Sequence, residues 1–119
     1  TALKEKKYSI IGYKGKQVRD NIHSSDLVNC FWEVFKKPKK GEVYNIGGGR
    51  FSNCSIIEAL ELVENISGIQ IKKKYIKSNR IGDHIWYISD LHKFKKNYPK
   101  WKQKFNTKKI LEELVNHLK

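Results

Sequence analysis

Three consecutive glycines, at positions 47, 48 and 49, constrain the fold more than any other feature of the sequence. Residues 43–46 before them have the short apolar character of a strand. Ser55 and Glu58 after them have the spacing of a capping box, which predicts the start of a helix. The buried face of this helix is predicted to include Ile56, Ala59, Leu60, Val63 and Ile66. A strand, a glycine turn and a helix in this order predict an α/β fold, with positive φ in the turn.

The remaining chain divides into short strands and amphipathic helices. Strands are predicted at residues 8–11, 17–23 and 69–76, and a loop with room for one short strand at 79–90. A helix is predicted to begin at Ser24 or Ser25, and two more are predicted at 91–97 and from residue 106 or 107 onward. The first helix is predicted to pack into the core through Leu27, Val28, Phe31, Val34 and Phe35.

The chain is strongly basic, with 25 Lys and Arg against 12 Asp and Glu and a net charge of +13. Such a balance is compatible with a nucleic-acid-binding module, which stays open as an alternative. The lysines are nevertheless spread along the whole chain, as in an ordinary solvated surface. The sequence holds no apolar run near the ~18 residues of a membrane helix and no signal peptide pattern. We therefore expect a cytoplasmic protein without membrane contact.

Two local patterns look like catalytic or cofactor motifs but have simpler explanations. The dinucleotide fingerprint needs Gly or Ala at its sixth position, where this chain has Ser52, and its acidic residue would be Glu64, inside a predicted helix. The run from His23 to Asp26 holds the residue types of a catalytic triad, but a triad needs neighbours in space rather than in sequence. We predict a tight turn at the glycines and helix capping at residues 23–26. With two distant cysteines, no metal site is predicted.

Only three of the 25 basic residues are arginines, and two of them lie in chemically suggestive places. Arg19 lies in the predicted strand 17–23, on the face that also carries Gln17. Arg80 precedes Asp83 across a glycine, so this loop offers a guanidinium to a phosphate and a carboxylate to a pair of hydroxyls. That combination fits a nucleotide. A surface pair between Arg80 and Asp83 explains the same residues equally well. Arg50 has no such context.

Three segments then carry a resemblance to a known family: GKQVRDNIHS at 15–24, GEVYNIGGG at 41–49 and NRIGDH at 79–84. Their order resembles the carboxyl-terminal part of the extended short-chain dehydrogenase/reductases, the NAD-dependent nucleotide-sugar epimerases and dehydratases. The resemblance covers essentially the whole chain. Within the family, the sequences of these segments are most similar to those of epimerases that act at C2 of a CDP-linked deoxyhexose. A 4-epimerase or a 4,6-dehydratase of the same superfamily stays open.

The resemblance implies an α/β fold made of three or more short strands and about four helices. By this resemblance, residues 1–119 form the substrate-binding carboxyl-terminal portion of a longer Rossmann-type enzyme, and the Rossmann half is absent from the chain. The implied partners are that half, the CDP-linked deoxyhexose and further copies of the protein in a homo-oligomer. Arg19 and Arg80 would contact the substrate pyrophosphate, and Asp83 would hold ribose hydroxyls.

The family's catalytic Tyr-x-x-x-Lys pair is not expected in this chain. Only Tyr98 and Lys102 have the spacing, and Pro99 disfavours a helix through Tyr98. The resemblance therefore implies catalytic residues and most NAD contacts in a preceding half, so that this chain alone is inactive. In the whole enzyme, NAD would take a hydride from C2 and return it to the opposite face.

Overall fold

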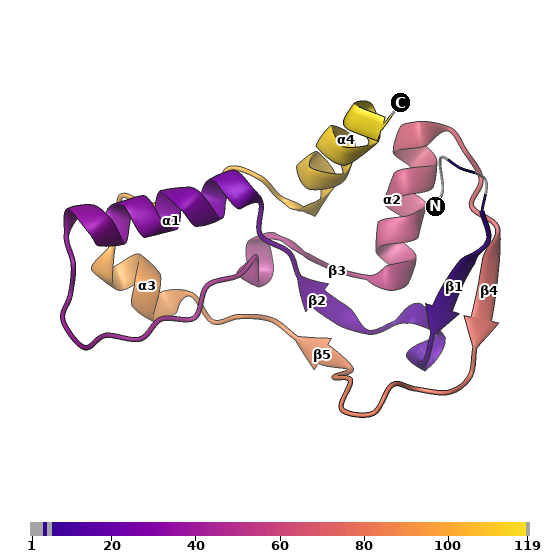
Figure 1. Ribbon diagram of the computed structural model, residues 1–119, viewed down its shortest axis with the longest axis horizontal. Helices are drawn as coiled ribbons and strands as arrows, with labels where there is room; N and C mark the ends of the chain where they lie inside the picture. The colour runs from indigo at the N-terminus through magenta and orange to yellow at the C-terminus, as the bar shows by residue number, and fades with distance from the viewer. Residues whose placement is uncertain (1–3, 5, 119) are drawn as a thin grey trace.

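The computed structural model describes residues 4 and 6–118, and Figure 1 shows them as an elongated molecule. The principal extents are 48 × 34 × 17 Å, and the radius of gyration is 16.7 Å. A compact chain of this length would have a radius of gyration of roughly 13–14 Å. The elements in chain order are β1 (Tyr8–Ile11), η2 (Tyr13–Gly15), β2 (Val18–Asp20), α1 (Ser24–Lys36), η3 (Gly49–Phe51), β3 (Asn53–Ser55), α2 (Ile56–Ser67), β4 (Lys73–Ile76), β5 (Trp86–Tyr87), α3 (His92–Asn97) and α4 (Thr107–Leu118).

The strands form two small sheets. β1 pairs in parallel with β4, so that Ile10 lies opposite Tyr75. In the other sheet β2 is central, antiparallel to β3 and parallel to β5. Because β2 is hydrogen-bonded on both edges, Arg19 at its middle has a fixed backbone position, opposite Cys54 on one side and Tyr87 on the other.

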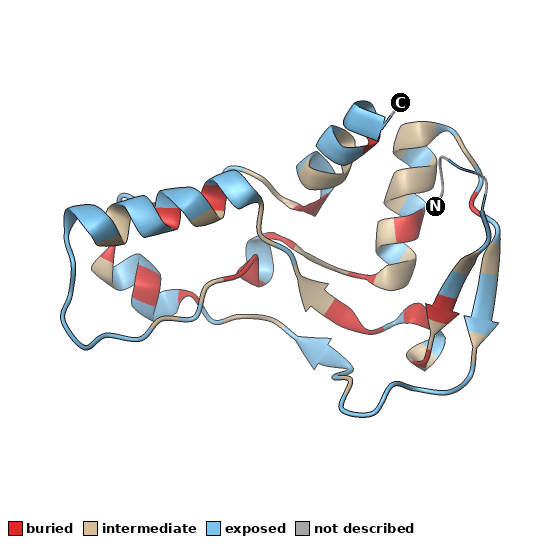
Figure 2. Cartoon of the chain, in the orientation of Figure 1, coloured by how far each residue is buried: buried red, intermediate tan, exposed pale blue. Residues whose placement is uncertain are grey.

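Two separate clusters of buried side chains stabilise the two ends of the molecule. In Figure 2, red marks buried residues on α1 and α3 at one end and on α2 and β1 at the other, with further red segments between them. One lies between α1 and α3 and consists of Cys30, Leu91, Phe94, Tyr98 and Trp101. The other lies under the β1–β4 sheet and consists of Ile10, Leu60 and Ile71. The central sheet β3–β2–β5 connects the two ends (Figure 1).

Several predicted elements are confirmed. β1 has the predicted bounds, α3 and α4 lie where they were expected, and β4 occupies the second half of the stretch 69–76. The capping box at α2 is complete, since the Glu58 N–H donates to Ser55 Oγ (3.2 Å) and the Ser55 N–H donates to Glu58 Oε2 (2.7 Å). These elements depend on interactions within a few residues, which the sequence displays directly.

The predicted strand at 43–46 is wrong. These residues form no strand in the described structure. Tyr44 and Ile46 pack against the α1–α3 cluster, while Val43 is 79% exposed. The apolar pattern favours an extended backbone, but a strand also needs a neighbouring edge to hydrogen-bond with.

The predicted core face of α1 is also wrong in part. Val28, Phe31 and Phe35 are 61–73% exposed, and the helix instead buries Asp26 and Cys30. The helical spacing was correct, but the buried face is set by the segment that packs against the helix.

Candidate functional site

An ion pair between Arg19 and Asp83 joins β2 to the loop that follows β4. Arg19 Nη2 donates to Asp83 Oδ1, and Arg19 Nη1 donates to the Val18 carbonyl oxygen at 2.7 Å. The Arg19 and Asp83 side chains are 33% and 23% exposed, so the pair lies at the surface but is partly covered. The two bonds fix the guanidinium and leave its other N–H groups available to a ligand.

Arg80 lies in the same loop and remains exposed. The Asp83 N–H donates to the Arg80 carbonyl oxygen at 3.2 Å, which closes the loop into a turn. Arg80 and Asp83 both line a cavity of about 130 Å³, whose other walls come from β1, Gln17 and Ile56. Among the described residues Asp83 pairs with Arg19, not with Arg80 as the surface-pair alternative supposed. The Arg19–Asp83 ion pair thus links Arg19 to the loop of Arg80 and Asp83, and the latter two residues line one cavity.

Gln17 is a further residue of this site that the sequence did not single out. Its side chain is only 8% exposed and lines the same cavity. Its Nε2 donates to the Ile11 carbonyl oxygen (2.9 Å), while its Oε1 has no hydrogen-bond partner among the described residues. The sequence feature that could have indicated Gln17 is its position two residues before Arg19, on the same face of the predicted strand.

The glycine turn at residues 47–49 packs closely against the backbone of neighbouring segments. A Cβ on Gly48 would overlap the carbonyl oxygens of Ser52 and Asn21. Asp20 Oδ2 accepts from the Gly49 N–H (2.8 Å) and the Ser89 N–H (3.1 Å), and Gly49 has the predicted positive φ of 57°.

This turn offers no cradle for a dinucleotide. Asp20 and Ser52 already occupy the space beside the glycines, and the Glu58 N–H in the first turn of α2 donates to Ser55 Oγ. An NAD pyrophosphate needs such N–H groups free. The glycine turn and the start of α2 therefore do not fit NAD.

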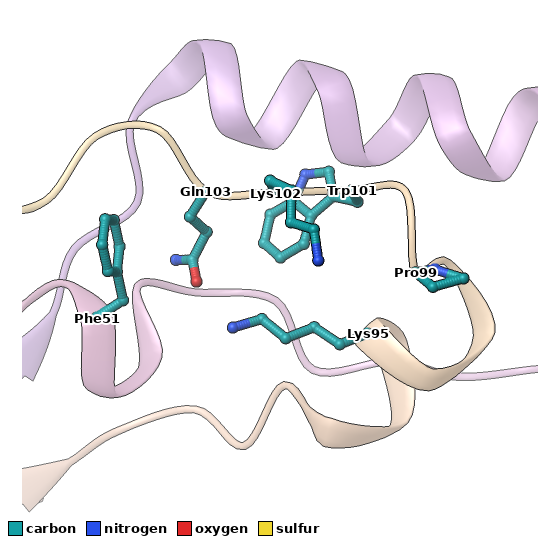
Figure 3. A pocket seen from close by; sticks show the side chains of 6 residues that line it. All are labelled: Phe51, Lys95, Pro99, Trp101, Lys102 and Gln103. Carbon is teal, nitrogen blue, oxygen red and sulfur yellow. The ribbon is translucent and has the colours of Figure 1, made fainter.

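Tyr98 and Lys102 lie apart from the arginine site. Tyr98 is 3% exposed in the α1–α3 cluster, where its hydroxyl donates to the Lys37 carbonyl oxygen at 3.1 Å. Burial, with a contribution from Tyr44, raises the pKa of Tyr98, so its hydroxyl stays protonated at neutral pH. Lys102 is exposed and lines a different cavity of about 280 Å³ together with Lys95 and Gln103 (Figure 3).

The run from His23 to Asp26 organises the start of α1, as predicted, although His23 rather than a serine is the cap. Its Nδ1 accepts from the Ser25 N–H at 3.2 Å, its Nε2 lies 3.3 Å from Glu113, and its ring stacks on Phe105. Asp26 faces inward and accepts from backbone N–H groups of residues 104 and 105.

The described residues contain no group of three or more His, Cys, Asp or Glu placed to hold a metal ion. In the same part of the chain, no helix combines the length and the apolar character needed to cross a membrane.

Comparison with known proteins connects this site to one family. Residues 1–47 match the family model described as the NAD dependent epimerase/dehydratase family. CDP-paratose 2-epimerase of Salmonella typhi is 27% identical over 113 residues, which cover 93% of this chain and 32% of that protein. UDP-arabinose 4-epimerase 1 of Arabidopsis thaliana is 34% identical over 100 residues, covering 82% and 23% of the two chains.

Solved structures show the same relationship. UDP-glucuronic acid 4-epimerase from Bacillus cereus, in complex with UDP-glucuronic acid and NAD, superposes with a TM-score of 0.82 at 26% identity, over 98% of this chain and 37% of that one. dTDP-glucose 4,6-dehydratase from Bacillus anthracis, in complex with NAD, superposes with a TM-score of 0.79 at 30% identity. The superposition covers 97% of this chain and 35% of that one.

These comparisons relate the chain to the NAD-dependent epimerase/dehydratase family of nucleotide-sugar enzymes, the extended short-chain dehydrogenase/reductases. The chain spans 32% and 23% of the length of the two curated relatives and 37% and 35% of the two solved chains.

The family-model match corrects the expected fold assignment. An α/β chain with short strands and four helices in its described part is confirmed. The expectation of a carboxyl-terminal portion without any Rossmann half is wrong, because residues 1–47 match the family model and indicate that part of the Rossmann portion is present. The expectation rested on the lack of a glycine-rich NAD turn in the sequence. The parallel partner of β1 is β4, more than 60 residues later, and such pairing has no local sequence signature.

Proposed function

We propose that residues 1–119 form a nucleotide-sugar-binding unit and that the substrate is a CDP-linked deoxyhexose epimerised at C2, as for CDP-paratose 2-epimerase. The observation that carries the proposal is the junction of Arg19, Asp83 and Arg80 beside one small cavity. The similarity to CDP-paratose 2-epimerase, which extends over 93% of the chain, supports the choice of sugar.

In this proposal the two arginines bind the pyrophosphate. Arg19 is held from β2 and by Asp83, so little conformational entropy is lost when its remaining N–H groups meet phosphate oxygens. Arg80 is exposed and can turn toward the same anion. One carboxylate oxygen of Asp83 accepts from Arg19, and its other oxygen accepts from ribose hydroxyls. The nucleotide is then anchored, and the sugar end is left free to reorient.

The role of this chain is binding and orientation. Anchoring a remote, unreacting part of a substrate lowers the entropic cost of placing its reacting carbon. NAD supplies hydride chemistry in this family, but the glycine turn and the start of α2 do not fit NAD, so we assign no redox role to them. We propose no catalytic acid or base in this chain, and the 119-residue chain alone is expected not to turn over substrate.

A UDP-sugar 4-epimerase is the second candidate. The Arabidopsis UDP-arabinose 4-epimerase is 34% identical, which exceeds the 27% of the CDP-paratose enzyme, although it matches less of the chain. The two candidates differ in base, so relative affinity for CDP and UDP separates them.

Calorimetric titration of the 119-residue chain with CDP and with UDP tests the proposal. Arg19→Lys and Arg80→Lys keep the charge and remove the forked donor, and each is expected to weaken binding about ten- to a hundredfold, as for loss of a charge-assisted hydrogen bond. Arg50→Lys is the matched control, since Arg50 is exposed and lines a different cavity. It should bind like the unmodified chain.

Two outcomes would overturn the proposal. One is that neither nucleotide binds the unmodified chain at millimolar concentration. The other is that all three Arg→Lys variants behave alike while the chain binds DNA or RNA with steep salt dependence, which would favour a nucleic-acid-binding module. Tighter binding of UDP than CDP would support the 4-epimerase candidate instead.

A further inference from the structure

The turn between β1 and β2 has an unusual backbone. Four consecutive residues, Gly12, Tyr13, Lys14 and Gly15, have positive φ angles of 67°, 46°, 52° and 75°. Tyr13 and Lys14 are the two residues other than glycine with positive φ in the described chain. Such a conformation is strained for a side chain larger than glycine, and strained residues persist only where surrounding contacts compensate for them.

The compensating contacts come from both ends of the loop that holds Arg80 and Asp83. The Tyr13 N–H donates to Asn79 Oδ1 at 3.2 Å, and the Tyr13 hydroxyl donates to the Asp83 carbonyl oxygen at 3.3 Å. Gly12 lies so close to Asn79 that a Cβ would be 3.1 Å from the Asn79 Cα. The strained turn is therefore fixed against residues 79 and 83, and the loop is fixed against the turn.

This attachment matters because the loop has little packing of its own. Arg80, Ile81 and Gly82 are exposed, and no part of the Ile81 side chain is covered. A segment with few buried contacts is held mainly by its end points. One end point is Asn79 and the other is Asp83, and Tyr13 contacts both.

We propose that Tyr13 is a positioning residue for nucleotide recognition. Its hydroxyl holds the Asp83 backbone, which places the Asp83 carboxylate against Arg19 at the edge of the cavity that Arg80 also lines. Tyr13 lines a separate hollow beyond the turn, and its effect on the ligand passes through Asp83. This inference rests on the proposed function of the Arg19–Asp83–Arg80 site and adds a residue outside it.

Tyr13→Phe tests the inference, because it removes the hydroxyl and keeps the ring and the backbone. Affinity for CDP, measured by calorimetry on the 119-residue chain, is expected to fall about three- to tenfold, as for the loss of one neutral hydrogen bond. Tyr75→Phe is the matched control. Tyr75 lines the same hollow as Tyr13, and its hydroxyl makes no hydrogen bond within the described structure. It should change the affinity less than twofold.

A double-mutant cycle separates positioning from general stabilisation. In an Asp83→Ala background there is no carboxylate to position, so Tyr13→Phe is expected to change CDP affinity less than twofold. If its effect is as large there as in the unmodified chain, Tyr13 has only a structural role and the inference is overturned.

Amide hydrogen exchange without nucleotide gives a second readout. Tyr13→Phe is expected to speed exchange in residues 79–83, whereas Tyr75→Phe is not. If the unmodified chain binds CDP but Tyr13→Phe alters neither affinity nor exchange, the inference fails and the proposed function stands. If the unmodified chain does not bind CDP, the proposed function fails, and faster exchange would support only the attachment of the loop to Tyr13.

Discussion

At the scale of single residues, Asp26 shows how a side chain can have a role beyond its local one. The sequence placed it favourably in the first turn of a helix. In the structure it is 0% exposed and accepts hydrogen bonds from the backbone N–H groups of Lys104 (3.0 and 3.1 Å) and Phe105 (3.1 Å). The Trp101 indole N–H donates to the Asp26 carbonyl oxygen at 3.0 Å. This one residue thus ties α1 to the segment before α4.

Asp26→Ala is expected to lower the free energy of unfolding by about 2–4 kcal/mol, because the partly buried N–H groups of residues 104 and 105 lose their acceptor. Urea denaturation monitored by circular dichroism measures this. Asp26→Asn keeps one acceptor oxygen and should cost less than Asp26→Ala. A loss below about 1 kcal/mol for Asp26→Ala would show that water or another group replaces the carboxylate.

At the scale of elements, Glu64 links α2 to the strand beside β1. Its carboxylate accepts from the Ile71 N–H at 2.8 Å and from Lys73 Nζ at 2.9 Å. The hydrogen bond from Lys73, followed by that from Ile71, holds the pKa of Glu64 below its usual value of 4.5. In the sequence, Glu64 stood out only as the acidic residue of a dinucleotide fingerprint that its place inside a helix argued against. Its structural role depends on residues seven and nine positions later.

This link predicts a pH-dependent contribution to stability. A carboxyl group whose pKa is lower in the folded state stabilises the fold above its unfolded pKa, and the contribution is lost as the pH falls through the folded pKa. Glu64→Gln is therefore expected to lower the melting temperature most at neutral pH. The difference in melting temperature between the variant and the unmodified chain should narrow below pH 4.5. Thermal denaturation between neutral and acidic pH measures this difference.

Glu61→Gln on the same helix is the control, because Glu61 is exposed and forms no ion pair within the described residues. Its melting temperature should follow that of the unmodified chain at every pH. A constant gap between Glu64→Gln and the unmodified chain over the whole pH range would contradict an electrostatic link.

At the scale of the whole molecule, the flat shape leaves much apolar surface exposed. On α1, Phe31, Trp32 and Phe35 are 61%, 56% and 73% exposed, and the rings of Trp32 and Phe35 stack with centroids 5.4 Å apart. A contiguous aromatic face of this kind on a monomer favours association. The buried cluster beside α1 takes Cys30 and the partly buried Val34 from this helix and leaves the three aromatic rings outside it.

We expect the isolated chain to dimerise or to form larger assemblies. Light scattering after size exclusion should show a mass above 14.0 kDa that rises with concentration. The double variant Phe31→Glu, Phe35→Glu should shift the mass toward that of the monomer. Leu118→Glu, at an exposed position on α4, should not. A monomeric unmodified chain at every concentration would contradict the expectation.

The sequence by itself determined the features that arise within about four residues. The capping box of α2, the apolar strand β1 and the amphipathic α4 follow from local hydrogen bonds and side-chain spacing, and all three are observed. The scarcity of arginine also directed attention to Arg19 and Arg80, which the structure brings to one site.

Only the tertiary structure decided which partners these elements meet. It paired Arg19 with Asp83, 64 residues away in sequence, left residues 43–46 without a neighbouring strand, and turned the aromatic side of α1 outward. Each outcome depends on which distant segment packs against which face. Hydrophobic burial and strand pairing are favourable with any neighbour of compatible shape and polarity, so they do not select one partner from local sequence. Periodicity within one segment does not contain that information.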